Sequence, residues 1–373
     1  MGERDVQVKR IVIYGAGDNG IRMYKWLQLA ELDGLVSAFC DRDYKTKKLY
    51  HISVPIIPYE EVGEDVLILV SVRKNEEIIE LLKRDEREFY LSFEDYAKAY
   101  HSQNEKLMDL ISEEPFEQND ENKLLQDYFE QKNYKVVEYD TNRKRCYIFF
   151  SSNGIYYPNQ KGAFLRTIYG DRYEWETLVS LSEIPQVAAK CIYVRDLRRA
   201  WYATGINADI DSVDELAEFL RKETTGYEVI TVGVSAGGYA AALFGAKINA
   251  QIAFAFSAQF SIYEFYNGPS AYFYLNKHLE NRAVSQYYNI CEAIKDTIPI
   301  AYFYPEENDG DRKQAVLVKD FSNVMSFPVI TATHGLELNN KERVRLLQMS
   351  VDEIKVLYAE NKGKSISAET FMA

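Results

Sequence analysis

A chain of 373 residues exceeds the ~100 to 200 residues of one ordinary globular domain, so its length predicts two domains. Its 44 Lys and Arg residues against 57 Asp and Glu residues give a net charge of −13, which disfavours nucleic acid and anionic membranes as partners. No uncharged apolar run approaches the ~18 residues of a transmembrane helix, and the amino terminus has no apolar stretch of signal type. We therefore expect a soluble, cytoplasmic protein without a transmembrane segment.

The four cysteines, Cys40, Cys146, Cys191 and Cys291, form no CxxC pair and lie mostly in apolar, strand-like contexts. This pattern is typical of reduced thiols buried in a cytoplasmic protein. The sequence therefore predicts neither a disulfide framework nor a metal site.

The first hundred residues contain a glycine-rich turn between a strand and a helix. Residues 8–14 have the pattern of a buried strand, and Gly15, Gly17 and Gly20 follow in GxGxxG spacing at the start of an amphipathic helix. In dinucleotide-binding folds the first glycine permits the tight turn, the second lets the backbone approach a phosphate, and the third allows close helix packing. Asp41 ends the next strand, near the expected place of a ribose-binding acid. Residues 1–100 are thus predicted to form a Rossmann-like nucleotide-binding domain.

Only about half of a full dinucleotide-binding fold fits into this length. The segments IVIYGAGDNG, FCDRD, ISVPIIPYEEV and DVLILVSV resemble the small amino-terminal nucleotide-sugar-binding domain of bacterial sugar acetyltransferases and other polysaccharide-biosynthesis enzymes. The resemblance implies a nucleotide-sugar at the turn. The alternative is a purely structural turn, in a scaffold that docks to biosynthetic partners or to a second copy of the chain.

The second half of the chain has a different organisation. Residues 101–133 are polar and strongly acidic, and they predict a helical linker. Over 134–373 helical stretches alternate with apolar strands, expected at 135–139, 146–151, 191–194, 228–233, 251–257, 300–304 and 327–333. Such alternation is typical of a parallel, doubly wound α/β sheet, whose sites lie at the carboxyl ends of the strands.

A GxSxG nucleophile elbow follows the fourth of these strands. Ser235 lies between the strand EVITVGV and a helix rich in Ala and Gly, with Gly233 and Gly237 on either side. The turn is so sharp that side chains at the two glycine positions would collide with the neighbouring strand and helix. The pattern predicts that the Ser235 hydroxyl is held out at the helix amino terminus as a nucleophile.

His334 is the predicted base for this serine. It follows the last expected strand and precedes an apolar-striped helix, the position of the histidine in an α/β hydrolase. The orienting acid should lie in the loop PEENDGDRKQA, which follows the preceding strand. Asp311 is favoured because it directly precedes a helix expected at 312–321, and Asp309 is the alternative because it lies in a glycine turn. The order nucleophile, acid, histidine is that of the α/β-hydrolase fold.

Two backbone amides are expected to bind the oxyanion of an acyl-transfer intermediate. The first is that of Ala236, directly after the nucleophile. The second belongs to the turn SSNG after the strand at 146–151, with Asn153 or its neighbour Ser152 as the donor.

Two further segments are expected to serve the substrate. The stretch after the strand at 191–194 carries Arg195, Arg198, Arg199 and Trp201, which we expect at the active face. Residues 258–297 are dense in aromatic side chains and predict a cap insertion. Aromatic rings and guanidinium groups suit a carbohydrate with negative charge, through stacking and bidentate pairing. Packing of the cap on the sheet explains the same aromatic residues.

The segments VRDLRRAWYATGI and ITVGVSAGGYAAALFGAKINA, with those around Asp311 and His334, are similar to α/β-hydrolase-fold proteins of bacterial capsule and surface-glycan biosynthesis, relatives of the carbohydrate O-acetyltransferase of accessory Sec systems. The resemblance implies that an acyl group is transferred to, or removed from, a sugar hydroxyl of a glycan or nucleotide-sugar. The residues themselves predict acyl transfer or ester hydrolysis through a Ser-His-Asp triad. That triad requires no cofactor, and acetyl-CoA is a candidate acyl donor.

Two other interpretations are open at this point. The first makes the amino-terminal domain catalytic, as a nicotinamide- or nucleotide-sugar-dependent enzyme, although it is short for a complete fold and has no separate substrate half. The second makes the chain a non-catalytic assembly factor of polysaccharide biosynthesis with a relic hydrolase domain, although no member of the triad is missing from the sequence.

Overall fold

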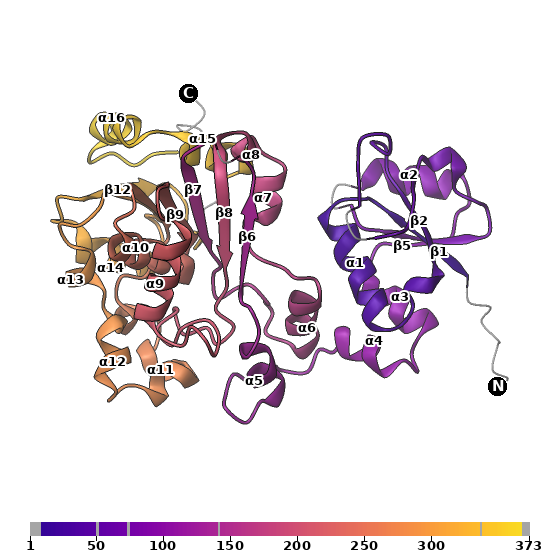
Figure 1. Ribbon diagram of the computed structural model, residues 1–373, viewed down its shortest axis with the longest axis horizontal. Helices are drawn as coiled ribbons and strands as arrows, with labels where there is room; N and C mark the ends of the chain where they lie inside the picture. Colours follow the sequence, from indigo (N-terminus) through magenta and orange to yellow (C-terminus); the bar gives the residue numbers. More distant parts are fainter. Residues whose placement is uncertain (1–8, 50–51, 73–74, 141, 336–337, 368–373) are drawn as a thin grey trace. The chain divides into compact units, whose positions relative to one another are not determined.

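The computed structural model describes residues 9–49, 52–72, 75–140, 142–335 and 338–367. The chain divides into two compact units, Met1–Phe116 with Tyr156–Arg172, and Glu117–Ile155 with Tyr173–Ala373. Each unit has a β-sheet of its own with helices packed on it (Figure 1). The division differs from the expected borders in three places. Of the expected linker, residues 101–116 belong to the first unit and residues 117–133 to the second, and residues 156–172 join the first unit instead of the second.

The first unit is built on a five-stranded sheet in the order β3-β2-β1-β4-β5, and all of its neighbouring strands are parallel. Its strands are β1 (Arg10–Tyr14), β2 (Val36–Cys40), β3 (Ile56–Ile57), β4 (Val66–Val70) and β5 (Phe89–Tyr90). Its helices are α1 (Asp18–Leu29), η1 (Asp33–Leu35), η2 (Tyr59–Glu61), α2 (Glu76–Arg84), α3 (Phe93–Tyr100), α4 (Glu105–Leu110) and α6 (Lys161–Tyr169). The central strands are apolar runs because both of their faces are covered.

Backbone contacts attach the segment around α6 to the residues that follow α4. The amide of Gly162 donates to the carbonyl of Ser112 at 3.0 Å, and the amide of Phe116 donates to the carbonyl of Asn159 at 2.9 Å. A Cβ atom at Gly162 would lie 2.7 Å from the carbonyl oxygens of Leu110 and Ser112, so only glycine permits this close approach.

The second unit is built on a seven-stranded sheet in the order β12-β11-β10-β9-β7-β8-β6. Its strands are β6 (Tyr134–Glu138), β7 (Arg145–Phe150), β8 (Ala188–Val194), β9 (Glu228–Val234), β10 (Ile252–Phe256), β11 (Ile300–Pro305) and β12 (Val324–Val329). Only the edge strand β6 runs antiparallel to its neighbour; the other pairs are parallel. This topology, with the elbow after the central strand β9, is that of the α/β-hydrolase fold.

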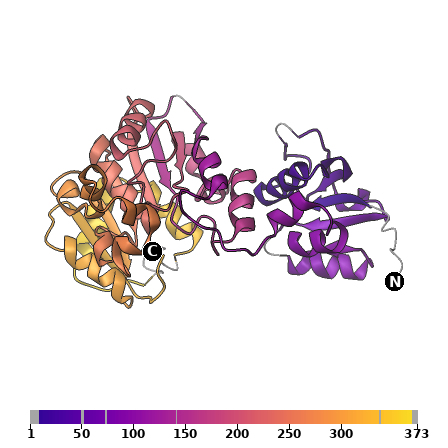
Figure 2. The ribbon, with the colours of Figure 1, turned by 90° about the horizontal axis from the view of Figure 1, so that it is seen from below.

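Helices cover both faces of this sheet (Figures 1 and 2). On one face Phe150 of β7 stacks on Phe244 at 5.5 Å between ring centroids, and on the other the hydroxyl of Tyr147 donates to the carbonyl of Leu347 at 3.0 Å. The helices of the unit are α5 (Lys123–Phe129), α7 (Glu176–Ser180), α8 (Ile184–Val187), α9 (Val213–Glu223), α10 (Ala236–Ile248), α14 (Asp309–Val318), α15 (Asn340–Gln348) and α16 (Val351–Asn361). The alternation of side chains along β7 thus buries the strand on both faces.

The insertion expected at 258–297 consists of short helices between β10 and β11: η3 (Ile262–Glu264), η4 (Gly268–Ala271), α11 (Phe273–Lys277), α12 (Arg282–Ser285), η5 (Gln286–Tyr288) and α13 (Cys291–Ile294). Its aromatic side chains divide between two environments, since Phe260, Tyr274 and Tyr288 are buried whereas Tyr263 and Tyr266 are exposed. Packing therefore accounts for part of the aromatic content.

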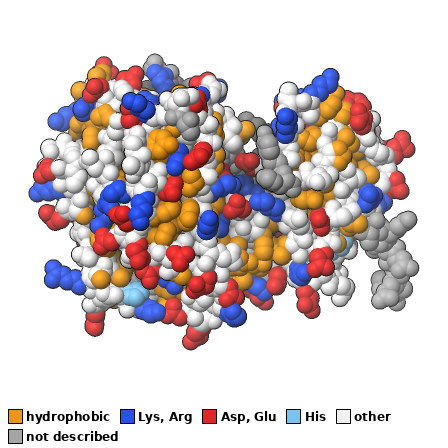
Figure 3. Space-filling model, viewed as in Figure 1, with side chains coloured by type: hydrophobic (Ala, Val, Ile, Leu, Met, Phe, Trp, Pro, Cys, Tyr) orange, Lys and Arg blue, Asp and Glu red, His pale blue; other side chains and the backbone are white. Residues whose placement is uncertain are grey.

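The surface carries charges of both signs. On the face shown in Figure 3, acidic and basic side chains are interspersed. Among the described residues, no helix has the length and apolar character that crossing a membrane requires.

Candidate active site

Ser235 occupies a strained turn between β9 and α10. Its backbone has φ 57° and ψ −121°, a conformation that costs energy for any residue with a side chain. A Cβ atom at Gly233 would lie 2.1 Å from the carbonyl oxygen of Gly237, and one at Gly237 would lie 2.4 Å from that of Phe150. Both glycines are therefore required by the turn, for the reason that the GxSxG pattern predicts.

The structure brings His334 and Asp311 to this serine. Nε2 of His334 lies 3.0 Å from Oγ of Ser235, and Nδ1 lies 2.8 Å from Oδ2 of Asp311. The Asp311 side chain is 2% exposed, and that of His334 is 29% exposed. Because the carboxylate only accepts hydrogen bonds, it holds a proton on Nδ1, and in neutral His334 this leaves Nε2 as the acceptor for the serine hydroxyl.

Asp309, the alternative acid, does not reach His334. Its side chain is 82% exposed and pairs with Arg312. The helix begins at Asp309 and not at the expected residue 312, because the Asn308 side chain caps it by accepting from the amide of Asp311 at 3.2 Å. Asp311 consequently lies in the first helical turn, facing inward.

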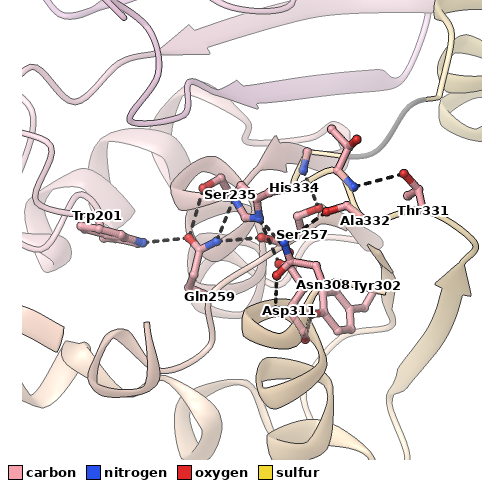
Figure 4. A network of polar contacts seen from close by, with 12 residues as sticks. Trp201, Ser235, Ser257, Gln259, Tyr302, Asn308, Asp311, Thr331, Ala332 and His334 are labelled. Atoms are coloured by element: carbon pink, nitrogen blue, oxygen red, sulfur yellow. Dashed lines mark hydrogen bonds and ion pairs between the residues drawn. The ribbon is translucent and has the colours of Figure 1, made fainter. Parts of the chain in front are cut away.

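A fourth residue, Gln259, joins this group from the loop after β10 (Figure 4). Its fully buried amide donates from Nε2 to the carbonyl of Ser257 at 2.8 Å, and Oε1 accepts from the indole N–H of Trp201 at 3.1 Å. These two partners fix the orientation of the amide, since a carbonyl only accepts and an indole N–H only donates. Oε1 also lies 3.3 Å from Oγ of Ser235, so the serine hydroxyl has two acceptors within reach.

The expected oxyanion donors fall into two groups. The amide of Ala236 is in the first turn of α10, where backbone N–H groups have no partner within the helix. The amide and the hydroxyl of Ser152 donate to Glu174, at 2.7 and 2.8 Å, so Ser152 is occupied. Of the two residues expected in the SSNG turn, Asn153 therefore stays the candidate donor.

The residues expected to bind substrate lie deeper than the sequence indicated. Arg195 is 4% exposed, donates to Asn133 and lies 4.4 Å from the ring centre of Tyr173. Trp201 is 1% exposed and bonded to Gln259. Both side chains are therefore buried and bonded to other residues of the protein, whereas the sequence predicted that they contact the substrate.

Arg198 and Arg199 are half-buried in the same loop. The guanidinium of Arg198 lies 3.3 Å from the ring centre of Phe129. Asp196 organises the loop, because its buried carboxylate accepts from the amides of Arg198, Ala200 and Tyr202. Burial raises the pKa of Asp196, and these amide bonds oppose the shift.

Tyr202 links that loop to the SSNG turn. Its fully buried hydroxyl donates to the carbonyl of Ser151 at 2.7 Å. Together with the clamp of Glu174 on Ser152, this bond fixes the backbone from which the second oxyanion donor is expected.

The glycine-rich turn of the first unit has two glycines that packing explains and one that it does not. Gly15 has φ 109°, and a Cβ atom there would meet Oγ of Ser71 at 2.5 Å; at Gly20 it would meet the carbonyl oxygen of Gly15 at 1.9 Å. At Gly17 nothing lies within 4 Å of such an atom. The middle glycine therefore borders open space, as an approach to a ligand requires.

Asp41 is committed to the same turn from inside the protein. Oδ2 accepts from the amide of Ala16 at 2.8 Å and pairs with Lys47 at 2.7 Å. Burial favours a raised pKa for Asp41, but the hydrogen bonds from Lys47 and from backbone amides outweigh it, and the pKa is lowered. Asp41 is thus a carboxylate that already supports the turn.

Within the described parts of the chain, no group of three His, Cys, Asp or Glu side chains is arranged to hold a metal ion.

No family model and no curated protein matches the chain. Solved structures with a similar arrangement include the capsule O-acetyltransferase of Neisseria meningitidis serogroup A (13% identity, TM-score 0.42, covering 62% of this chain and 92% of that one). A fungal esterase from Rhizomucor miehei has 12% identity and a TM-score of 0.36, over 61% and 80% of the two chains. Brefeldin A esterase, a bacterial homologue of human hormone-sensitive lipase, has 13% identity and a TM-score of 0.32, over 62% and 77%.

Sequence reasoning missed Gln259 and Glu174, and it gave no role to Tyr202 within the segment VRDLRRAWYATGI. A weak signal exists for Gln259, since Ser257 and Gln259 interrupt an apolar run at the end of β10, beside the elbow strand. Glu174 and Tyr202 carry no comparable local signal, because they act on a turn more than twenty residues earlier in the chain.

Proposed function

We propose that this protein catalyses acyl transfer or ester hydrolysis through Ser235, with a carbohydrate as the acyl acceptor or as the ester. The observation that carries the chemistry is the continuous contact from Asp311 through His334 to Ser235, with the serine raised on a strained elbow. A serine hydroxyl needs an adjacent base to act as a nucleophile, and that base needs an orienting group.

In the first half-reaction, Oγ of Ser235 attacks the carbonyl carbon of the donor while its proton passes to Nε2 of His334. The Asp311 carboxylate stabilises the imidazolium that forms. The amides of Ala236 and Asn153 bind the oxyanion, which collapses with cleavage of the bond to the leaving group. His334 returns the proton to that group, leaving an acyl-Ser235 ester.

In the second half-reaction a hydroxyl attacks the carbonyl carbon of the acyl-enzyme, and His334 accepts its proton. The bond from that carbon to Oγ of Ser235 then breaks, and His334 returns the proton to Oγ. A sugar hydroxyl gives an O-acyl transferase, and water gives an esterase. Oε1 of Gln259 is a fixed hydrogen-bond acceptor near Oγ of Ser235, so it orients a hydroxyl group that lies beside it. The choice of a carbohydrate rests on the resemblance to surface-glycan biosynthesis proteins, and acetyl-CoA is the donor to test first.

The test is mass spectrometry of the whole chain after incubation with acetyl-CoA or p-nitrophenyl acetate. The proposal expects an acetyl adduct on the wild type and none on Ser235→Ala. Adding sugars and nucleotide-sugars should then yield an acetylated sugar from a transferase, or free acetate from an esterase. Absence of both adduct and turnover with every donor would contradict the proposal.

We further propose that the glycine-rich turn binds the phosphate group of a nucleotide-sugar, because the space beside Gly17 has no explanation in packing. The positive end of α1 would face the phosphate. Calorimetric titration of the whole chain with UDP-sugars, CMP-sugars, acetyl-CoA and NAD tests this. The site is supported if one of these ligands binds and Gly17→Val abolishes that binding. If none of the four binds, the turn has only a structural role.

A further inference from the structure

The first unit contains a small cavity with an unusual lining. It measures about 190 Å³ and lies between α1 and the 156–172 segment that carries α6, both of which belong to this unit. Arg22, Arg166 and Arg172 line it, and none of its lining residues is an Asp or a Glu. The charged residues of its lining are thus all basic, in a chain whose net charge is −13.

The packing of α1 on α6 places these groups together. Arg22 and Trp26 are one helical turn apart on α1, and the Trp26 indole N–H donates to the carbonyl of Arg166 at 3.1 Å. A Cβ atom at Gly170 would lie 2.6 Å from that carbonyl and 3.3 Å from Cγ of Arg22, so glycine lets the two sides approach. The cavity is therefore built by specific contacts of the fold.

Its electrostatics favour an anion. Arg166 pairs with Glu94 at 3.2 Å and donates to the carbonyl of Leu110, yet burial still lowers the pKa of its guanidinium. Arg22 and Arg172 add positive charge to the same space. The planar donors of guanidinium groups match the oxygens of a phosphate.

We propose that this cavity binds the phosphoryl group of a phosphorylated small molecule, held by Arg22, Arg166 and Arg172. Its volume is below the ~300 to 1,000 Å³ of pockets that enclose drug-sized ligands, so it holds the phosphoryl end and leaves the remainder outside. Tyr157, at the rim and 76% exposed, offers a ring face to that remainder. The cavity borders the glycine-rich turn through Asn19, whereas Gly15, Gly17 and Asp41 do not line it.

The test is isothermal titration of the whole chain with pyrophosphate and with glucose 1-phosphate, with glucose as the uncharged control. We expect one site per chain for the two phosphorylated probes and no heat from glucose. Arg22→Gln and Arg172→Gln should each weaken binding about tenfold or more, which is the effect of losing one charge-assisted contact. Arg84→Gln is the matched control, since Arg84 is exposed on α2, pairs with Asp85 and lies outside the cavity.

Two further variants separate this site from its alternatives. Arg22→Lys keeps the charge but loses the planar fork, so it should bind with intermediate affinity, and it replaces Arg22→Gln if that variant does not fold. Gly17→Val should leave binding unchanged. The proposal is overturned if neither probe binds at millimolar concentration, if the arginine variants bind like the wild type, or if Gly17→Val abolishes binding.

Discussion

Oδ2 of Asp311 lies 2.8 Å from Nδ1 of His334, although Asp311 is only two residues from an aspartate that faces solvent. This relationship gives a matched pair of variants. Asp311→Asn should lower kcat by up to ~10⁴-fold, because the amide can no longer hold the correct tautomer or stabilise the imidazolium. Asp309→Asn should change kcat little. Steady-state kinetics on an activated acetyl ester measures both, and the reverse ranking would assign the role to Asp309.

The fold and the elbow could be predicted because their signals are local. The GxSxG turn needs glycines for steric reasons that depend only on the adjoining strand and helix, and the structure shows the same collisions. From the sequence, Asp311 could be favoured over Asp309 as the orienting acid but not assigned. The start of α14 depends on the Asn308 cap, and the inward direction of Asp311 depends on the loop that carries His334.

Other parts of the site depend on contacts between distant segments. The position of Gln259 in the site depends on its hydrogen bonds with Trp201, Ser235 and Ser257. Ser152 and Asn153 are equivalent in sequence until Glu174 takes the amide of Ser152. Similarly, the helical pattern at 161–169 does not reveal which of the two sheets the helix joins.

Replacement of Gln259 should destabilise the protein. Gln259→Leu leaves the buried indole N–H of Trp201 and the carbonyl of Ser257 without this partner, so the free energy of unfolding should fall by about 1–3 kcal/mol. Urea denaturation measures it, with Gln251→Leu, at the exposed position directly before β10, as the control. Equal stability of the two variants would show that the amide does not hold this loop.

Glu174 should affect catalysis without touching the substrate. Glu174→Ala releases the amide and the hydroxyl of Ser152, which loosens the turn that carries the Asn153 amide. We expect kcat to fall by less than the ~10²–10³-fold that loss of an oxyanion donor costs, with KM nearly unchanged. Glu183→Ala, at an exposed site, is the control. An unchanged kcat would show that Glu174 does not position the oxyanion donor.

The cysteines should be inert in the folded protein. Burial raises the pKa of Cys40 and Cys146 to about 12 and that of Cys291 to about 11, and it also raises the pKa of Cys191. Because the thiolate is the reactive form, Ellman's reagent at pH 8 should modify the native chain very slowly and all four thiols in urea. Rapid modification of a native thiol would contradict these environments.

A fluorophosphonate probe shows whether Ser235 is an activated nucleophile, because it reacts covalently only with an activated serine hydroxyl. The probe should attach covalently to Ser235 in the wild type, identified by mass spectrometry of the labelled peptide, and labelling should fall strongly in Asp311→Asn and vanish in Ser235→Ala. Labelling of Ser235→Ala to the same extent as the wild type, or a folded wild type that stays unlabelled at every pH and probe concentration, would contradict the proposed serine chemistry.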